Sequence, residues 1–70
     1  MKDDKFTINV QIGGFRLPLS IPRKDEELYR KAEKIVVQIL EQYQRQYSQR
    51  PTEEILTLVA FRIAVIVSKQ

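Results

Sequence analysis

The stretch FTINVQIGGFRLPLSI, residues 6–21, decides the fold of this 70-residue chain. Apolar and polar residues alternate from Phe6 to Ile12, as in a strand with one buried face. Two adjacent glycines follow, and a second alternating run extends from Arg16 to Ile21. This arrangement predicts a β-hairpin over 6–21 that carries its large apolar side chains on one face.

The hairpin turn has two candidate positions. Either Gly13-Gly14 or Gly14-Phe15 can supply the positive φ angles of a two-residue turn, and both place apolar residues opposite apolar ones, so the register stays open. Pro18 has no N–H to donate. We therefore expect its nitrogen to face outward on a sheet edge, or to lie at a bulge.

A long amphipathic helix is predicted over about 23–47, after Pro22 ends the strand. Acidic residues at 25–27 suit the positive end of a helix dipole. The apolar positions recur at spacings of three and four residues and form one stripe, made of Leu28, Ala32, Ile35, Val36, Ile39, Leu40, Tyr43 and Tyr47.

A second helix is predicted over about 52–69, after a break that ends at Pro51. We expect the Thr52 hydroxyl to act as its N-cap. This helix is apolar almost all round, so one packed face cannot account for it, and we predict a homodimer with helix 2 near the twofold axis. The expected interface residues are Ile55, Val59, Arg62, Ile63 and Ile66.

These elements predict an α+β domain of ββαα order that forms an obligate homo-oligomer. Residues 1–5 are expected to be a disordered tail, and residues 6–70 a single domain. A chain of this length buries only about 60% of the surface that its unfolded form exposes, so association with a second copy would supply missing stability.

The composition argues against an enzyme. The chain has no Cys and no His, so disulfides, zinc sites with nitrogen or sulfur ligands and a Ser-His-Asp arrangement are excluded from this chain alone. We expect no cofactor and no metal. The charged N-terminus lacks the pattern of a secretory signal, and the apolar run 55–67 is too short to span a bilayer, which favours the cytoplasm.

The chain resembles the globular head of the ZapA family of bacterial cell-division proteins over about residues 6–67. The order and spacing of four stretches carry the resemblance, and these are Ile8 to Gly14, Pro18 to Arg23, Glu26 to Ala32 and Ala60 to Ala64.

The resemblance implies a non-enzymatic regulator that dimerises, binds filaments of FtsZ, and promotes their bundling at the mid-cell division site. In the family a coiled coil after the head builds a tetramer, and this sequence stops at Gln70. The resemblance places the partner-binding face on charged head surface near the hairpin tip and the helix break, and the expected contact residues are Arg16, Arg45, Arg50 and Glu53.

Two other interpretations remain open. A strand followed by two helices in a mildly basic chain, with net charge +3, also fits a dimeric ribbon-helix-helix DNA-binding protein, in which Thr7, Asn9 and Gln11 would read base edges. The internal hairpin and the long first helix argue against this interpretation, so no nucleic-acid partner is expected. A structural oligomer without any contact to FtsZ is the other interpretation.

Overall fold

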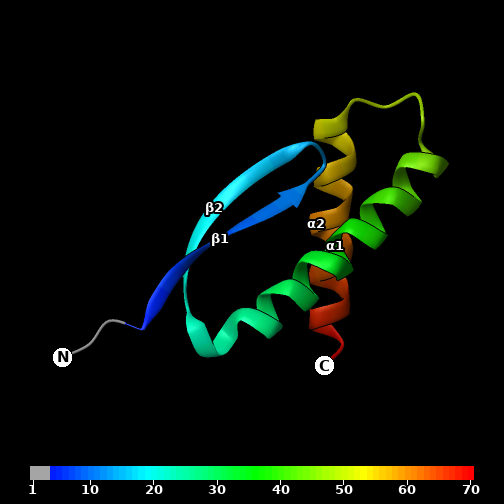
Figure 1. Cartoon of the computed structure of the whole chain (residues 1–70). Coiled ribbons are helices and arrows are strands. Elements are labelled where there is room, and N and C mark those ends of the chain that lie inside the picture. Colours follow the sequence, from blue (N-terminus) through cyan, green and yellow to red (C-terminus); the bar gives the residue numbers. More distant parts are fainter. Residues whose placement is uncertain (1–3) are drawn as a thin grey trace.

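The computed structural model describes residues 4–70, which form a two-stranded sheet followed by helices. Strand β1 spans Lys5–Ile12 and strand β2 spans Phe15–Pro22. A single 3-10 turn, η1 (Arg23–Asp25), leads into helix α1 (Glu26–Gln46), and a short connection leads to helix α2 (Thr52–Ser68). The hairpin lies to one side of α1, and α1 crosses α2 (Figure 1). The predicted ββαα order is confirmed.

The hairpin turn is Gly13-Gly14, which settles the register that the sequence left open. Both glycines have positive φ, at 59° and 86°, as this two-residue turn requires. Ile12 therefore pairs with Phe15, Val10 with Leu17, and Ile8 with Leu19. All of these apolar side chains share one face, because side chains alternate along each strand.

Pro18 lies opposite Asn9 in the ladder. Along an antiparallel ladder, the backbone N–H and C=O groups of successive residue pairs point alternately toward the partner strand and away from it. The pair that flanks the turn points toward the partner strand, so the backbone groups of Asn9 and Pro18 point away from it. The outward carbonyl oxygen of Asn9 accepts a hydrogen bond from Arg30 in α1, as this alternation requires. The nitrogen of Pro18 thus faces outward on the β2 edge, where no ladder hydrogen bond is lost.

The N-terminal boundaries differ slightly from the sequence prediction. Strand β1 begins at Lys5, and the carbonyl oxygen of Asp4, also in the expected tail, accepts a hydrogen bond from the Arg23 N–H. The rest of the expected tail, residues 1–3, lies outside the described residues. The prediction of a Thr52 N-cap is wrong. The N-cap of α2 is Pro51, whose extended ψ of 152° lets its carbonyl oxygen accept from the N–H groups of Glu54 and Ile55, and no side chain caps this end.

Two apolar clusters hold the elements together. The first lies between the hairpin and the start of α1, where Ile8, Val10 and Ile21 are buried with Tyr29 packed against them. In the second, the buried side chains are Leu40, Ile55 and Val59, at the crossing of α1 and α2. Ile12 packs against both clusters and joins them.

The hairpin tip is docked on the crossing of the two helices. A Cβ atom added to Gly13 would lie 3.2 Å from Cδ2 of Leu40 and 3.7 Å from Cδ2 of Leu56. Figure 1 shows the tip beside the first turns of α2. The absence of a side chain at Gly13 therefore permits this close approach, in addition to the positive φ of the turn.

The chain is more extended than a compact monomer of its length. Its principal extents are 50 × 29 × 15 Å and its radius of gyration is 14.3 Å, against about 11 Å for a compact domain of this size. Its accessible surface is 5882 Å², which is about 1300 Å² more than a compact monomer of this mass exposes. The two buried clusters therefore lie within a thin, elongated body.

Candidate partner-binding surface

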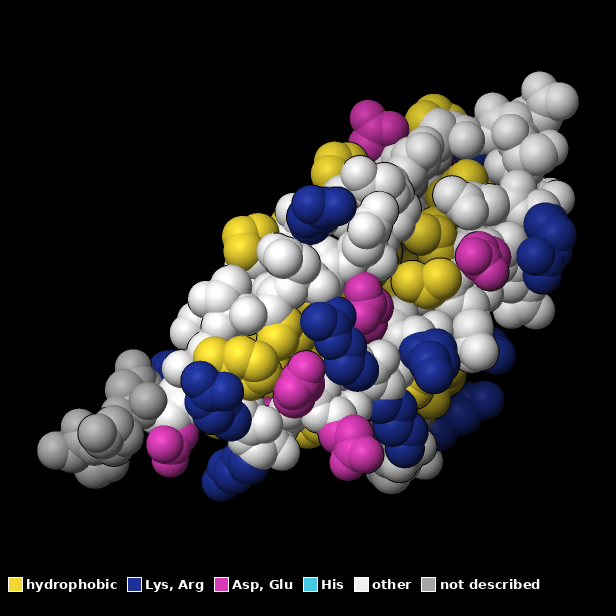
Figure 2. All heavy atoms as spheres, in the orientation of Figure 1, with side chains coloured by type: hydrophobic (Ala, Val, Ile, Leu, Met, Phe, Trp, Pro, Cys, Tyr) yellow, Lys and Arg dark blue, Asp and Glu magenta, His cyan; other side chains and the backbone are white. Residues whose placement is uncertain are grey.

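The described part of the chain offers several surfaces for contact with a partner. Within residues 4–70, no group of three or more carboxylate-bearing side chains is arranged to hold a metal ion. No helix in the same range is long and apolar enough to cross a membrane. Figure 2 shows acidic and basic side chains interspersed over one face of the molecule. The surfaces that remain to be considered are charged, polar or apolar contact faces.

Four charged residues were expected to contact a partner, and all four are exposed. Arg16 follows the hairpin turn in β2, and Glu53 is in the first turn of α2. The tip of the hairpin contacts α2 near its start, so these two residues lie at the same end of the molecule (Figure 1). Arg45 is in the last turn of α1 and Arg50 lies in the connection that leads to this end.

Arg50 is held by neighbouring side chains. Its Nη1 lies 2.8 Å from Oε1 of Glu54, and its guanidinium carbon lies 5.8 Å from the ring centroid of Tyr47. The ring of Tyr47 is 6.0 Å from that of Tyr43, with 58° between the ring planes. Arg50 thus lies in a row with the rings of Tyr47 and Tyr43. Its pairing with Glu54 was not predicted, although the spacing of four residues was a signal.

The tyrosine rings of this row pack within the chain. Tyr43 is half-buried against the cluster of Leu40, Ile55 and Val59, and Tyr47 is also half-buried. The sequence interpretation in which these rings continue the apolar stripe is confirmed for Tyr43. A ring that packs in this way offers less of its face for stacking on a base.

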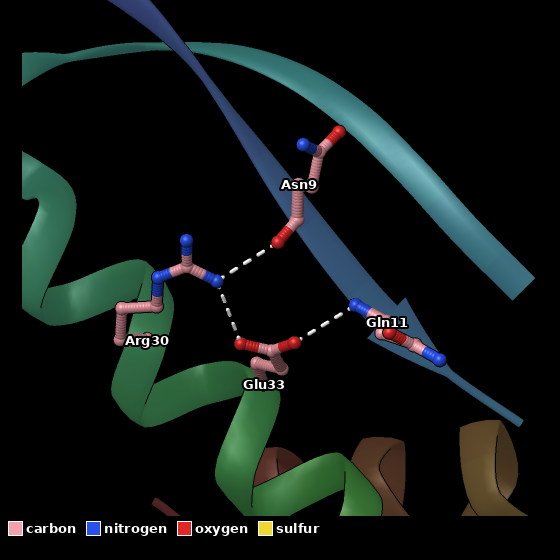
Figure 3. Close-up of polar contacts among 4 residues, drawn as sticks. All are labelled: Asn9, Gln11, Arg30 and Glu33. Atoms are coloured by element: carbon pink, nitrogen blue, oxygen red, sulfur yellow. Dashed lines mark hydrogen bonds and ion pairs between the residues drawn. The ribbon is translucent and has the colours of Figure 1, made fainter.

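Side chains of α1 form hydrogen bonds with backbone groups of β1 (Figure 3). Glu33 Oε2 accepts a hydrogen bond from the Gln11 N–H at 2.8 Å, and Arg30 Nη1 donates to the Asn9 carbonyl oxygen at 2.9 Å. Arg30 Nη1 also lies 3.0 Å from Oε1 of Glu33. The bond from Gln11, and secondly the one from Arg30, hold the pKa of the Glu33 carboxyl below its ordinary value.

This arrangement contradicts the ribbon-helix-helix interpretation. One edge of β1 pairs with β2 of the same chain, and the other edge is bound to α1 at Asn9 and Gln11. A ribbon-helix-helix dimer instead needs that strand to pair with the strand of a second subunit. Thr7, Asn9 and Gln11 are exposed, but the strand edge that carries them is bound to α1 at Asn9 and Gln11.

The five residues expected at a dimer interface divide into two groups. Ile55 and Val59 are buried within the single chain against Leu40, at 4% and 3% exposure. Ile63 is half-buried beside them, whereas Arg62 and Ile66 are exposed. An apolar pattern that runs all round a helix does not reveal which side the chain itself covers.

Helix α2 carries apolar residues on more than one side that the chain does not cover. Phe61 is 70% exposed and Val67 is 63% exposed, and Leu58 is also open to solvent. A second uncovered set lies on β2 and on one side of α1, and it consists of Phe15, Leu17, Leu28 and Ile35. Contiguous exposed apolar surface is typical of protein contact sites.

An open apolar groove lies between the hairpin and α1. Its volume is about 140 Å³, and it is lined by Val10, Ile12, Leu19, Tyr29, Ala32, Glu33 and Val36. Leu17 pairs with Val10 on the same face of the hairpin, and Ile35 follows Ala32 along α1. The second uncovered apolar set thus continues the apolar surface of the groove.

Comparison with known proteins gives one match. A family model described as "Cell division protein ZapA" matches residues 8–70 of the chain. No curated protein and no solved structure matches.

Proposed function

The chain belongs to the ZapA family, a non-enzymatic family of cell division proteins associated with FtsZ, and on this basis we propose that it dimerises and bundles FtsZ filaments. Bundling would promote assembly of the division ring at mid-cell in the cytoplasm. The family match covers most of the chain and supports the cell-division role. Dimerisation, bundling and the site of action are the parts that require experiment.

The observation that best supports self-association is the surplus of accessible surface. The chain exposes about 1300 Å² more than a compact monomer of its mass, and a standard protein interface covers about 800 Å² on each partner. Uncovered apolar side chains on α2 and beside the groove contribute to this surplus. A second copy can cover such surface without any change in the fold of the subunit.

Bundling follows from bivalency. A twofold dimer presents two copies of one binding face, and each copy can contact a different filament. Once one face is bound, the second contact occurs at the effective concentration set by the geometry of the dimer, so two weak contacts give a firm link. No covalent chemistry is required of the protein.

The proposed contact residues are Arg16, Arg45, Arg50 and Glu53. All four are exposed, and a mixed charged surface can recognise a filament surface of complementary charge. Arg50 is the most restricted of them, because Glu54 and Tyr47 hold its guanidinium. A group that is already ordered loses less entropy when it binds a partner.

Co-sedimentation with FtsZ filaments tests the proposal. The wild-type chain should pellet with filaments, and the double variant Arg16→Glu/Arg50→Glu should lose this pelleting while keeping the wild-type oligomeric mass. Lys31→Glu/Lys34→Glu is the matched control, because it makes the same change in net charge at exposed positions of α1. Unchanged pelleting of the Arg16/Arg50 variant would remove these residues from the site.

The same experiment tests the alternative of a structural oligomer. That alternative predicts an oligomer by sedimentation velocity that never pellets with filaments at any protein concentration. A chain that pellets as a strict monomer would instead contradict bundling through bivalency.

A further inference from the structure

Phe61 is the most exposed of the large apolar side chains described in residues 4–70. It lies in the middle of α2 and on the side away from Val59, which faces Leu40. Of the thirteen residues from 55 to 67 only Arg62 is charged, so the outer side of α2 is poorly suited to water. The side chain of Phe61 is 70% exposed, so its own chain does not cover the ring. Contact with another surface would bury this large apolar area.

The groove between the hairpin and α1 has the size and the chemistry for such a ring. Its volume of about 140 Å³ is close to that of apolar cavities of about 150 Å³ that take up benzene. Hydrophobic side chains supply six of its seven lining residues, including Leu19 on the hairpin side and Ala32 on the helix side. The small side chain of Ala32 leaves room on the helix side.

We propose that the ring of Phe61 from a second copy of the chain inserts into the groove between the hairpin and α1, and that the contact is reciprocal. The inference rests on the proposed self-association and specifies how it occurs. A twofold dimer then contains two identical contacts, each with one aromatic ring and one groove. The neighbouring apolar surface at Leu17 and Ile35 is covered in the same contact.

A second copy fits this groove better than a foreign protein does. The chain has surface to hide on both sides of the contact, namely the outer side of α2 and the groove rim. One reciprocal interface covers both, and the surplus of about 1300 Å² exceeds the roughly 800 Å² per subunit that a stable interface uses. A foreign partner in the groove would leave α2 uncovered.

Photocrosslinking tests where the ring lies. Phe61 is replaced by p-benzoylphenylalanine in the full chain, the protein is irradiated, and the crosslinked peptides of the dimer band are identified by mass spectrometry. The proposal predicts crosslinks to residues 10–36 of the other copy. The control carries the same probe at Val67, which is 63% exposed but lies away from the proposed insertion, and it should not label the groove.

Sedimentation equilibrium measures the contribution of the contact. Phe61→Ala should raise the dimer dissociation constant by about 30-fold, the loss expected when an aromatic anchor is truncated. Ala32→Phe should raise it by a similar factor because the new ring fills the groove within its own subunit. Gln38→Ala is the control, as Gln38 is exposed on α1 and does not line the groove. Circular dichroism verifies that each variant is folded.

Three results would overturn the proposal, and they are distinguishable. Crosslinks from position 61 to position 61 or 65 of the other copy would show direct pairing of two α2 helices. A wild-type dissociation constant for both Phe61→Ala and Ala32→Phe would place the interface elsewhere while leaving self-association intact. A strictly monomeric wild-type chain would contradict the proposed self-association and this contact together.

Discussion

The Glu33 side chain accepts a hydrogen bond from the backbone N–H of Gln11, with 2.8 Å between the nitrogen and Oε2. This bond joins α1 to the outward edge of β1, where an unpaired strand would otherwise offer its backbone to other chains. Arg30 satisfies the Asn9 carbonyl oxygen on the same edge. The helix thus anchors the hairpin and blocks the strand edge at two neighbouring positions.

The Glu33 contact predicts a pH dependence of stability. Folding lowers the pKa of this carboxyl, so its contribution is complete above the unfolded value of about 4.3 and is lost as the pH falls through the lower folded value. We expect Glu33→Gln to lower the urea midpoint at pH 7 and to approach wild type at an acidic pH below the folded value, where the native carboxyl is protonated. Glu41→Gln, exposed on the same helix, is the control. An equal deficit of Glu33→Gln at both pH values would show that ionisation of Glu33 does not stabilise the fold.

The two turn glycines should differ in their tolerance of alanine. Both have positive φ, which costs an alanine about 1 kcal/mol. An added Cβ at Gly14 meets no atom within 4 Å, whereas at Gly13 it lies 3.2 Å from Leu40, which is 2% exposed. We expect urea denaturation to show Gly13→Ala as the less stable variant, by about a further 1 kcal/mol. Equal losses would mean that the docked tip moves aside freely.

Leu40 should be among the most sensitive core positions. It is 2% exposed and packs against Ile55 and Val59 at the helix crossing. Truncation of such a residue costs about 2–5 kcal/mol, which is a large share of the stability of a domain this small. Leu40→Ala should therefore unfold at a much lower temperature in calorimetry. Leu28→Ala, at a 63% exposed site, should lose less than about 0.5 kcal/mol.

Arg50 should matter little for stability, whatever its role in binding. The Arg50 and Glu54 side chains are both more than half exposed, at 57% and 54%, and such surface pairs contribute about 0–1 kcal/mol. We expect Arg50→Ala to change the free energy of unfolding by less than about 0.5 kcal/mol. A larger loss, measured by urea denaturation, would mean that defects of Arg50 variants in filament binding report on folding.

Local patterns predicted the elements well, because hairpins and amphipathic helices have distinct periodicities. The turn position was not predictable, since both glycine options kept apolar residues opposite each other, and the contacts of Gly13 with Leu40 and Leu56 lie far away in sequence. The Thr52 cap failed because Pro51 supplies the carbonyl oxygen that begins the helix. The preference of Thr for N-cap positions therefore did not identify the cap, because Pro51 occupies that position without a side-chain hydrogen bond.

The surface was harder to predict than the fold. Helix α2 is apolar on all sides, so its sequence indicated that two sides are covered but not which side belongs to the chain itself. The structure puts Ile55 and Val59 inside and Phe61 outside. The hydrogen bonds of Arg30 with Asn9 and of Glu33 with Gln11 could not be predicted from a short-range sequence pattern, because each joins residues that are more than 20 positions apart.

Ile12 packs against both apolar clusters, and this position determines how cooperatively the molecule unfolds. If the bridge at Ile12 is weakened, the strand end can open while the helix crossing persists, since each cluster has its own buried residues. Amide hydrogen exchange would then report two protection levels instead of one. The half-buried Ile12 beside the turn thus couples the unfolding of the two clusters, together with the docked tip at Gly13.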